Sequence, residues 1–356
     1  MNLENSNSTK LFPGFQLTIV LQGPIPSRVE NLNKTIATIR GLFPKAELIV
    51  STWEGQSALL SKFESPPDHI VLSQDPGPDL VDPFSQRTIN ATRQRVSTLA
   101  GLRHASRPHC LKMRTDFGLT STSVYAKWVR HNGFQNQDGL LRSSQIGILS
   151  LCSRDPEMTS ILFHPSDFMM VGETECLIKY WSADSEPVRL KTIGERLRDP
   201  IGGLEPLAVS VEQNLFIGYL NSRCDEQEVI KLQYFGEMSL ALAERSIKSF
   251  HATFQMLDPV ECGVLIPTHL RNKYHTAYGS YKAFEFNREG ALQKELERIR
   301  TAFQMPRRAT RYLTRWYFRR SLHNWIYIAA MLSGGLGISF IQRLRRWYRA
   351  SSNRVG

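Results

Sequence analysis

Cysteine is scarce in this sequence of 356 residues, and its pattern excludes two classes of small stabilised protein. The five cysteines are odd in number and widely spaced, and no two of them form a C-x-x-C pair. A disulfide framework needs pairs of cysteines, and a structural zinc site needs closely spaced thiolates. We therefore expect neither feature, and we expect the chain to fold in a reducing compartment.

A secretory leader is also lacking. The first 16 residues are polar and contain no basic start followed by an apolar run, which a signal peptide requires. We expect residues 1–15 to be a flexible N-terminus and the body of the protein to stay in the cytoplasm.

Acidic residues and lysine are missing from residues 301–356, which contain 11 arginines. The net charge of the whole chain is +11, so the remaining residues carry no net charge. Any contact with a polyanion is therefore expected in this arginine-rich segment.

An uncharged run of 17 residues, 325–341, lies between two arginine clusters of this segment. As a helix it would span about 26 Å, less than the hydrocarbon core of about 30 Å, and the flanking arginines disfavour translocation. We expect residues 301–356 to form a helical anchor that lies in, or re-enters from, an anionic membrane surface. A buried core helix is the alternative. Binding to nucleic acid is disfavoured because the arginines flank an apolar run, and we expect no such partner.

Short apolar runs that end in turn residues alternate with stretches of helical periodicity over residues 16–300. This alternation predicts one α/β domain whose mostly parallel sheet is flanked by helices. The expected strands cover residues 17–21, 46–50, 69–72, 110–116, 146–151 and 168–171. The expected helices cover residues 31–43, 85–105, 173–181, 211–220, 238–249 and 291–300. Residues 187–206, rich in charge, Gly and Pro, are expected to form a loop or lid.

Small and polar residues follow each of the first three expected strands. Open parallel sheets bind ligands outside the carboxyl ends of their strands, so these turns are candidates for binding a nucleotide. The candidates are Gln22, Gly23, Pro24, Thr52, Trp53, Glu54, Asp75 and Gly77, with Trp53 able to stack and Asp75 able to bind a ribose or base edge. Arg93, on the following helix, can fork onto a phosphate. The alternative is that these are ordinary turns, which any α/β protein needs.

The fourth expected strand carries alternating charges. Lys112, Arg114 and Asp116 share one face of it, opposite an apolar face. A departing diphosphate needs cationic groups, or an aspartate that holds a divalent metal. The alternative is a solvated edge strand with a local ion pair.

Two further segments supply candidate bases. His164 and Asp167 lie between apolar runs, and Asp167 is a candidate base for an attacking sugar hydroxyl. Glu212, near the start of an expected helix, is the rival base. The alternative for His164 and Asp167 is an ordinary turn in which the histidine is hydrogen-bonded. The alternative for Glu212 is an acid in the first turn of a helix, where the helix dipole favours a negative charge.

A series of short strings resembles the WavE lipopolysaccharide-synthesis family. They occur in order along the chain, and the resemblance covers roughly residues 16–285, with the tail outside it. The strings are VLQGPI (20–25), FPKAE (43–47), VSTWEG (50–55), DPGP (75–78), RQ with VST and AG (93–101), LKMRTD (111–116) and FHPSD (163–167). The resemblance implies a bacterial enzyme of lipopolysaccharide-core or related surface-glycan assembly, organised like GT-A type glycosyltransferases.

The chain departs from such transferases at one motif. They usually carry a D-x-D metal motif where this sequence has Arg114-Thr-Asp116, so only the last carboxylate is present. Two possibilities follow: Asp116 binds Mg²⁺ or Mn²⁺ with water and phosphate completing the shell, or Lys112 and Arg114 replace the metal.

Taken with the resemblance, these residues predict a glycosyltransferase at the cytoplasmic face of the inner membrane. It would move a sugar from a nucleotide sugar to a lipid-linked glycan acceptor. Two other classes stay open at this point: a sugar-nucleotide-modifying enzyme, and a non-catalytic membrane scaffold of a glycan-assembly complex.

Overall fold

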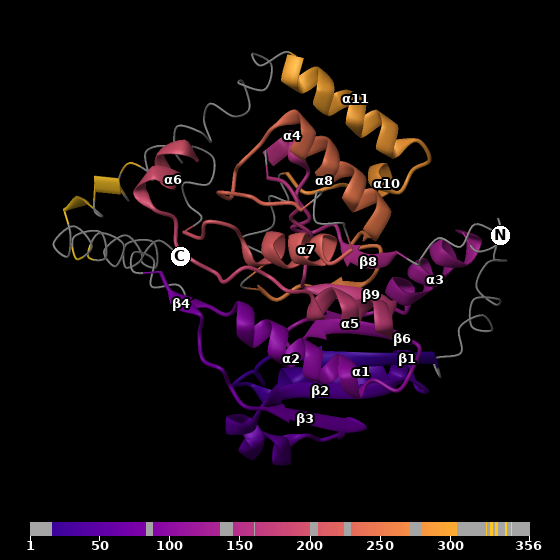
Figure 1. Ribbon diagram of the computed structural model, residues 1–356. Coiled ribbons are helices and arrows are strands. Elements are labelled where there is room, and N and C mark those ends of the chain that lie inside the picture. The colour runs from indigo at the N-terminus through magenta and orange to yellow at the C-terminus, as the bar shows by residue number, and fades with distance from the viewer. Residues whose placement is uncertain are drawn as a thin grey trace, which may run out of the picture.

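A seven-stranded sheet forms the centre of the protein (Figure 1). The computed structural model describes residues 16–82, 88–135, 145–159, 161–199, 206–223, 229–268, 270, 279–304, 325, 328, 329, 332, 333, 339 and 343. The strand order is β10-β8-β9-β6-β1-β2-β3, and β9 is antiparallel to both neighbours while the other pairs are parallel. The strands are β1 (Leu17–Gln22), β2 (Glu47–Trp53), β3 (His69–Ser73), β6 (His109–Arg114), β8 (Ile146–Leu149), β9 (Met169–Glu173) and β10 (Phe254–Leu257). The predicted α/β class with a mostly parallel sheet is confirmed.

Helices cover both faces of this sheet, which explains why β1 and β2 are buried along their whole length. One face packs against α1 (Val29–Leu42) and α3 (Ser123–Gln135). The other face packs against α2 (Ala91–His104), α5 (Thr174–Ser182), α7 (Val211–Asn221) and α8 (Leu240–Thr253). Helix α11 (Ala291–Gln304) packs on the outside of α8.

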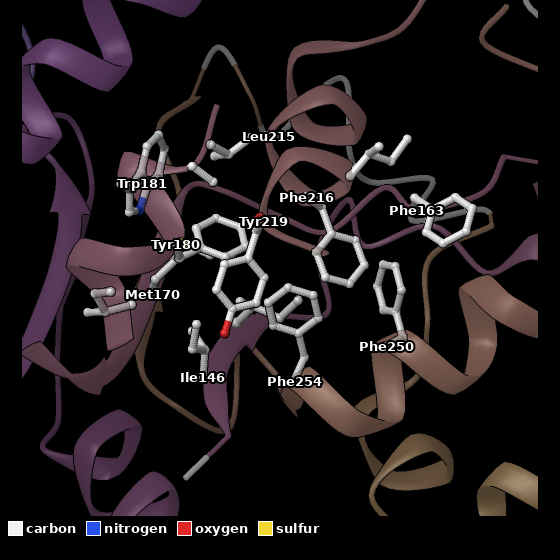
Figure 2. Packing of buried hydrophobic residues seen from close by; sticks show 14 of the residues in the cluster. Ile146, Phe163, Met170, Tyr180, Trp181, Leu215, Phe216, Tyr219, Phe250 and Phe254 are labelled. Atoms are coloured by element: carbon white, nitrogen blue, oxygen red, sulfur yellow. The ribbon is translucent and has the colours of Figure 1, made fainter. Parts of the chain in front are cut away.

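An aromatic cluster fixes α5, α7 and α8 on the second half of the sheet (Figure 2). The ring of Phe216 lies 4.8 Å from that of Phe254 and 5.3 Å from that of Phe250, centre to centre. Tyr180 of α5 adds a ring 6.1 Å from Phe254. Aromatic pairs at such separations stabilise a core beyond the area they bury. The cluster therefore holds the start of α7, where Glu212 lies, in a fixed position.

Three sequence expectations need correction. The helix expected from residue 85 begins at Ala91, because Thr88–Ile89 pairs instead as a short strand, β5, with β4 (Leu80–Val81). The loop expected over residues 187–206 contains a helix, α6 (Ile193–Arg198), begun by a capping box of Thr192 and Glu195. The strand expected to reach residue 116 ends at Arg114.

Several small elements were not expected from the sequence. They are η3 (Glu54–Lys62), β7 (Gly118–Leu119), α4 (Pro156–Thr159), β11 (Val264–Leu265) and α10 (Ala283–Phe286). Strand β10 and helix α3 were also missed.

The expected N-terminal segment and most of the expected membrane anchor lie outside the described residues. Over the part of the chain that the structure describes, no helix is long and apolar enough to cross a membrane.

Candidate active site

The carboxyl ends of β1, β2, β3 and β6 meet at one edge of the sheet, as the sequence predicted. Gln22 pairs with Ser51 on one side and with Arg114 on the other, and Trp53 pairs with Ser73. Parallel pairing therefore gathers the three predicted ligand-binding turns and the end of the charged strand β6 along one edge.

The turn after β1 is fixed by backbone hydrogen bonds. Gly23 adopts a left-handed φ of 113°, and its N–H donates to the carbonyl of Ser51 over 3.0 Å. The Thr115 hydroxyl donates to the Pro24 carbonyl over 2.7 Å. Gln22 is buried, and its side-chain oxygen accepts from the Ser97 hydroxyl of α2 over 2.8 Å. Gln22 thus supports the packing of α2, and Pro24 is the exposed residue of this turn.

In the turn after β2, too, some residues stabilise the turn from inside and another is exposed. The Thr52 hydroxyl donates to the side-chain oxygen of Gln56 over 2.8 Å, and Trp53 is only 7% exposed. Trp53 therefore supports the turn in this structure and offers no free ring face for stacking. Glu54 is exposed.

The turn after β3 is tied to α2 by an ion pair. Arg93 donates two hydrogen bonds of 2.6 Å to the carboxylate of Asp75, which also accepts from the backbone N–H of Gly77 over 2.9 Å. Arg93 further donates to the Asn90 side chain. The hydrogen bonds from Arg93 hold the pKa of Asp75 below its usual value. Both partners are partly exposed, so a polar ligand at this edge can reach them.

Lys112 lies deep in the site. It is fully buried on β6, its ammonium donates to the backbone carbonyl of Asp167 over 2.5 Å, and it lies 4.6 Å from the centre of the Trp181 ring. Burial lowers the pKa of Lys112 to about 8. Since β6 lies between β1 and β9, the alternative of a solvated edge strand is excluded.

Arg114 and Asp116 form the local ion pair that the sequence left open. The guanidinium donates to both carboxylate oxygens of Asp116, over 2.9 and 2.7 Å. Its central carbon lies 5.6 Å from the centre of the Phe168 ring. Asp116 stands in the turn after β6, so it does not continue the strand face that carries Lys112.

Asp116, the carboxylate that we expected to bind Mg²⁺ or Mn²⁺, is paired with Arg114 in this structure. Such ions prefer several oxygen ligands, usually including carboxylates, and both oxygens of Asp116 accept from Arg114. Within the described ranges, no group of three His, Cys, Asp or Glu residues is placed to hold a metal.

A polar cavity of about 320 Å³ lies beside these groups. We call it the base pocket because it is lined by the two candidate general bases, Asp167 and Glu212. The first residues of α2 and α7 line it, so the positive ends of two helix dipoles face it. Its polar lining includes Asn90, Arg154, His164, Ser166, Asp167 and Glu212. The structure thus brings together three predicted catalytic residues, His164, Asp167 and Glu212, but Asp116 is not among the lining residues.

Asp167 is a buried carboxyl group in this pocket. Its side chain accepts a short hydrogen bond from the Gln94 amide of α2. Burial raises the pKa of Asp167, the nearby Glu212 carboxylate raises it further, and the Lys112 cation opposes both effects. Asp167 therefore has the environment that brings a general base closer to neutral pH.

His164 and Glu212 face each other in the same pocket. The Nε2 atom of His164 lies 3.7 Å from a Glu212 carboxylate oxygen. Burial lowers the pKa of His164 to about 4, and Arg154 adds to the effect. His164 is therefore a neutral imidazole at pH 7. The capping box of Ser210 and Gln213 sets the start of α7, and Gln213 also donates to the Leu162 carbonyl over 2.8 Å, which ties Glu212 to the His164 segment.

Arg154 lines the base pocket, but we did not predict it as a site residue from the sequence. Its signal was its place after the carboxyl end of β8, the same position relative to a strand that marked the other candidates.

This arrangement defines an α/β protein with a candidate ligand site at the carboxyl edge of its sheet. The family model of WavE lipopolysaccharide synthesis matches residues 17–323, and the chain belongs to this family. The match passes residue 285, where we expected the resemblance to end, and enters the arginine-rich segment that we expected to lie outside it.

Two other comparisons add little. No curated protein matches the chain. The crystal structure of S. aureus TarS 1–349 is similar with a TM-score of 0.31 and 10% identity, over 82% of this chain and 91% of that one.

Proposed function

We propose that this protein is a glycosyltransferase that moves a sugar from a nucleotide-sugar donor to a lipopolysaccharide-core or other surface-glycan acceptor. The family supports a role in glycan synthesis. The observation that carries the proposal is the base pocket, where two carboxyl groups and a neutral histidine meet beside the cationic strand β6.

The reaction needs a group that accepts a proton. The acceptor hydroxyl attacks the anomeric carbon of the donor, the bond from that carbon to the diphosphate oxygen breaks, and the nucleoside diphosphate departs with the bonding electrons. The hydroxyl proton goes to a carboxylate, and Asp167 is our first choice because its pKa is raised. Glu212, whose carboxylate lies 3.7 Å from Nε2 of His164, is the rival.

The departing diphosphate needs positive charge. Arg114 at the end of β6 and Arg93 in the first turn of α2 are both partly exposed, and the start of α2 adds its helix dipole. Lys112 is too deeply buried to touch the diphosphate, and it acts by holding the backbone of Asp167. These groups take the place of a metal in the proposed mechanism.

The finer parts of this proposal rest on the sequence. We propose a GT-A-like organisation for residues 16–300 and a lipid-linked acceptor at the cytoplasmic face of the inner membrane. The arginine-rich segment supports binding to an anionic membrane surface.

Two measurements test the function. A thermal-shift panel of nucleoside diphosphates, with and without Mn²⁺, should give at least one ligand that raises the melting temperature. Transfer of a labelled sugar to glycan from a strain lacking this protein then separates a transferase from a sugar-nucleotide-modifying enzyme. A chain that binds no nucleotide and transfers no sugar would be a scaffold instead.

Asp167→Asn tests the base. We expect kcat for transfer to fall at least about 100-fold, because an amide cannot accept the proton, while the nucleotide-induced thermal shift persists. Glu212→Gln is the rival variant, and Asp184→Asn, on an exposed side chain, is the control. Near-normal transfer by Asp167→Asn, together with loss of transfer in Glu212→Gln, would show that Glu212 is the base.

A further inference from the structure

A second and larger cavity, of about 1400 Å³, opens beside the base pocket. Ser150 and Leu151 line it directly after β8, and Asp258 and Pro259 line it directly after β10. Because β8 and β10 run parallel to β1 and β6, these residues lie at the same edge of the sheet as the candidate site.

The two cavities share one wall. Within the segment after β8, Leu151 and Asp155 line the large cavity, whereas Cys152 and Arg154 line the base pocket. A ligand in the large cavity therefore lies against the same stretch of chain that borders the proposed base.

Apolar side chains are unusually exposed in the large cavity. Phe284 of α10 is 78% exposed, and Val260 is 85% exposed. A bare aromatic ring is a platform on which the apolar face of a flat ligand can pack. Phe284 and Val260 both border the cavity, so a ligand with an apolar face that enters it removes their apolar surface from water.

A buried hydroxyl without a partner lies in the same wall. Tyr281 is only 5% exposed, lines the large cavity, and its hydroxyl makes no hydrogen bond among the described residues. Leaving a buried polar group unsatisfied costs about 1–3 kcal/mol, so an ordered water or a ligand hydroxyl that reaches this hydroxyl from the adjoining cavity would relieve that cost.

The charges of the wall select the class of ligand. Its described residues include seven carboxylates and four cationic side chains. Carboxylates accept hydrogen bonds from hydroxyl groups, and a net negative wall repels an anionic ligand. An uncharged ligand rich in hydroxyl groups, with apolar faces, fits these features best.

We propose that this large cavity is the acceptor groove, which binds the acceptor glycan through uncharged sugar rings. Phe284 packs against one ring, and the Tyr281 hydroxyl bonds to a sugar hydroxyl. The inference rests on the proposed function, since it names where that reaction takes its acceptor.

The test uses the full chain and truncated lipopolysaccharide from a strain of the source bacterium that lacks this protein. We expect Phe284→Ala to raise the KM for this acceptor about tenfold, with the nucleotide-induced thermal shift unchanged. Tyr281→Phe should raise it about threefold, and Phe284→Tyr should restore the normal value. Phe303→Ala, which removes an exposed ring of α11 outside the groove, is the matched control.

Each outcome decides one question. Absence of both nucleotide binding and transfer in the wild type would sink the proposed function and the groove with it. Normal transfer and a normal acceptor KM in Phe284→Ala and Tyr281→Phe would remove the acceptor groove and leave the function standing. With a lipid-free core oligosaccharide as acceptor, a KM that changes more than about tenfold on raising salt from about 0.05 to about 0.5 M would show that charge dominates, and the uncharged class would be wrong.

Discussion

At the scale of single residues, the site depends on one ammonium group that works through its neighbour. Lys112 contacts the backbone of Asp167, and its positive charge opposes the rise in the pKa of that carboxyl. The pKa of Lys112 itself, lowered to about 8, leaves it charged at neutral pH. Lys112 is therefore a positioning residue in the proposed mechanism.

Lys112→Met tests this positioning role. We expect kcat to fall about tenfold, because the Asp167 backbone loses its hydrogen bond. Transfer requires Asp167 as a carboxylate, and removing a nearby cation raises the pKa of Asp167 further. The acid limb of the pH–kcat profile should therefore move to higher pH, while the KM for the donor changes little. A lower kcat with an unmoved acid limb would indicate a purely structural effect.

His164 links the site to stability at acid pH. The unfolded imidazole takes a proton near pH 6.5, whereas burial keeps the folded imidazole neutral down to about pH 4. The unfolded state therefore binds more protons between these values, and stability falls as pH drops through this window. The loss from this group is on the order of 3 kcal/mol at most.

We expect His164→Gln to flatten this acid dependence. Urea unfolding at about pH 7 and about pH 4.5 should show a smaller loss of unfolding free energy in the variant than in the wild type. His104→Gln, on an exposed side chain of α2, should retain the wild-type loss. Equal losses in all three proteins would mean that another group controls acid stability.

At the scale of elements, the packing of α2 on the sheet explains one of the resembling strings. A Cβ on Gly101 would lie 2.5 Å from Cγ1 of Val20 and 3.0 Å from Cβ of Ser51. Glycine at this position therefore lets α2 approach β1 and β2 closely, and α2 carries Arg93 and Gln94 to the site.

Gly101→Ala should destabilise the protein by about 1–3 kcal/mol, because the clash exceeds the gain in helix propensity of about 1 kcal/mol. Gly41→Ala in α1 is the matched control, since a Cβ there meets nothing within 4 Å, and it should stabilise by up to about 1 kcal/mol. Urea unfolding measures both. Equal effects of the two substitutions would show that α2 is free to move away from β1.

Most helices and strands could be predicted where the hydrophobic pattern of a segment and the turn residues at its ends indicated the same element. β1 and β2 are buried runs that end in turns, and the structure has all of β1, β2 and β3 within a few residues of the expected bounds. β3 is the edge strand of the sheet, so of its residues only Val71 is buried. Helix α3 was missed because its sequence, SVYAKWVRHNGFQ, mixes β-branched and aromatic residues and lacks a clear start signal. Strand β10 was missed because its four residues directly follow α8 without a turn.

At the scale of the whole molecule, the sequence predicted which edge of the sheet carries the site but not its pairings. Parallel topology alone brings the strand ends together. The contacts of Asp167 with Gln94 and of His164 with Glu212 join residues far apart in the chain, and they follow from the packing of α2 and α7. No local pattern encodes such contacts, which is why the sequence left Asp167 and Glu212 as rivals.

The distribution of charge over the whole chain leads to a last prediction. The excess positive charge lies in residues 301–356, while the rest of the chain carries none. We therefore expect the full chain to bind vesicles containing anionic lipid and to be released by salt. Each arginine near such a surface contributes about 1 kcal/mol, so replacing Arg343, Arg345 and Arg346 with glutamine should weaken partitioning about 100-fold in a sedimentation assay. Vesicles of zwitterionic lipid alone are the control. Equal binding of the wild type to both kinds of vesicle would show that apolar contacts, not the arginines, attach this protein to membranes.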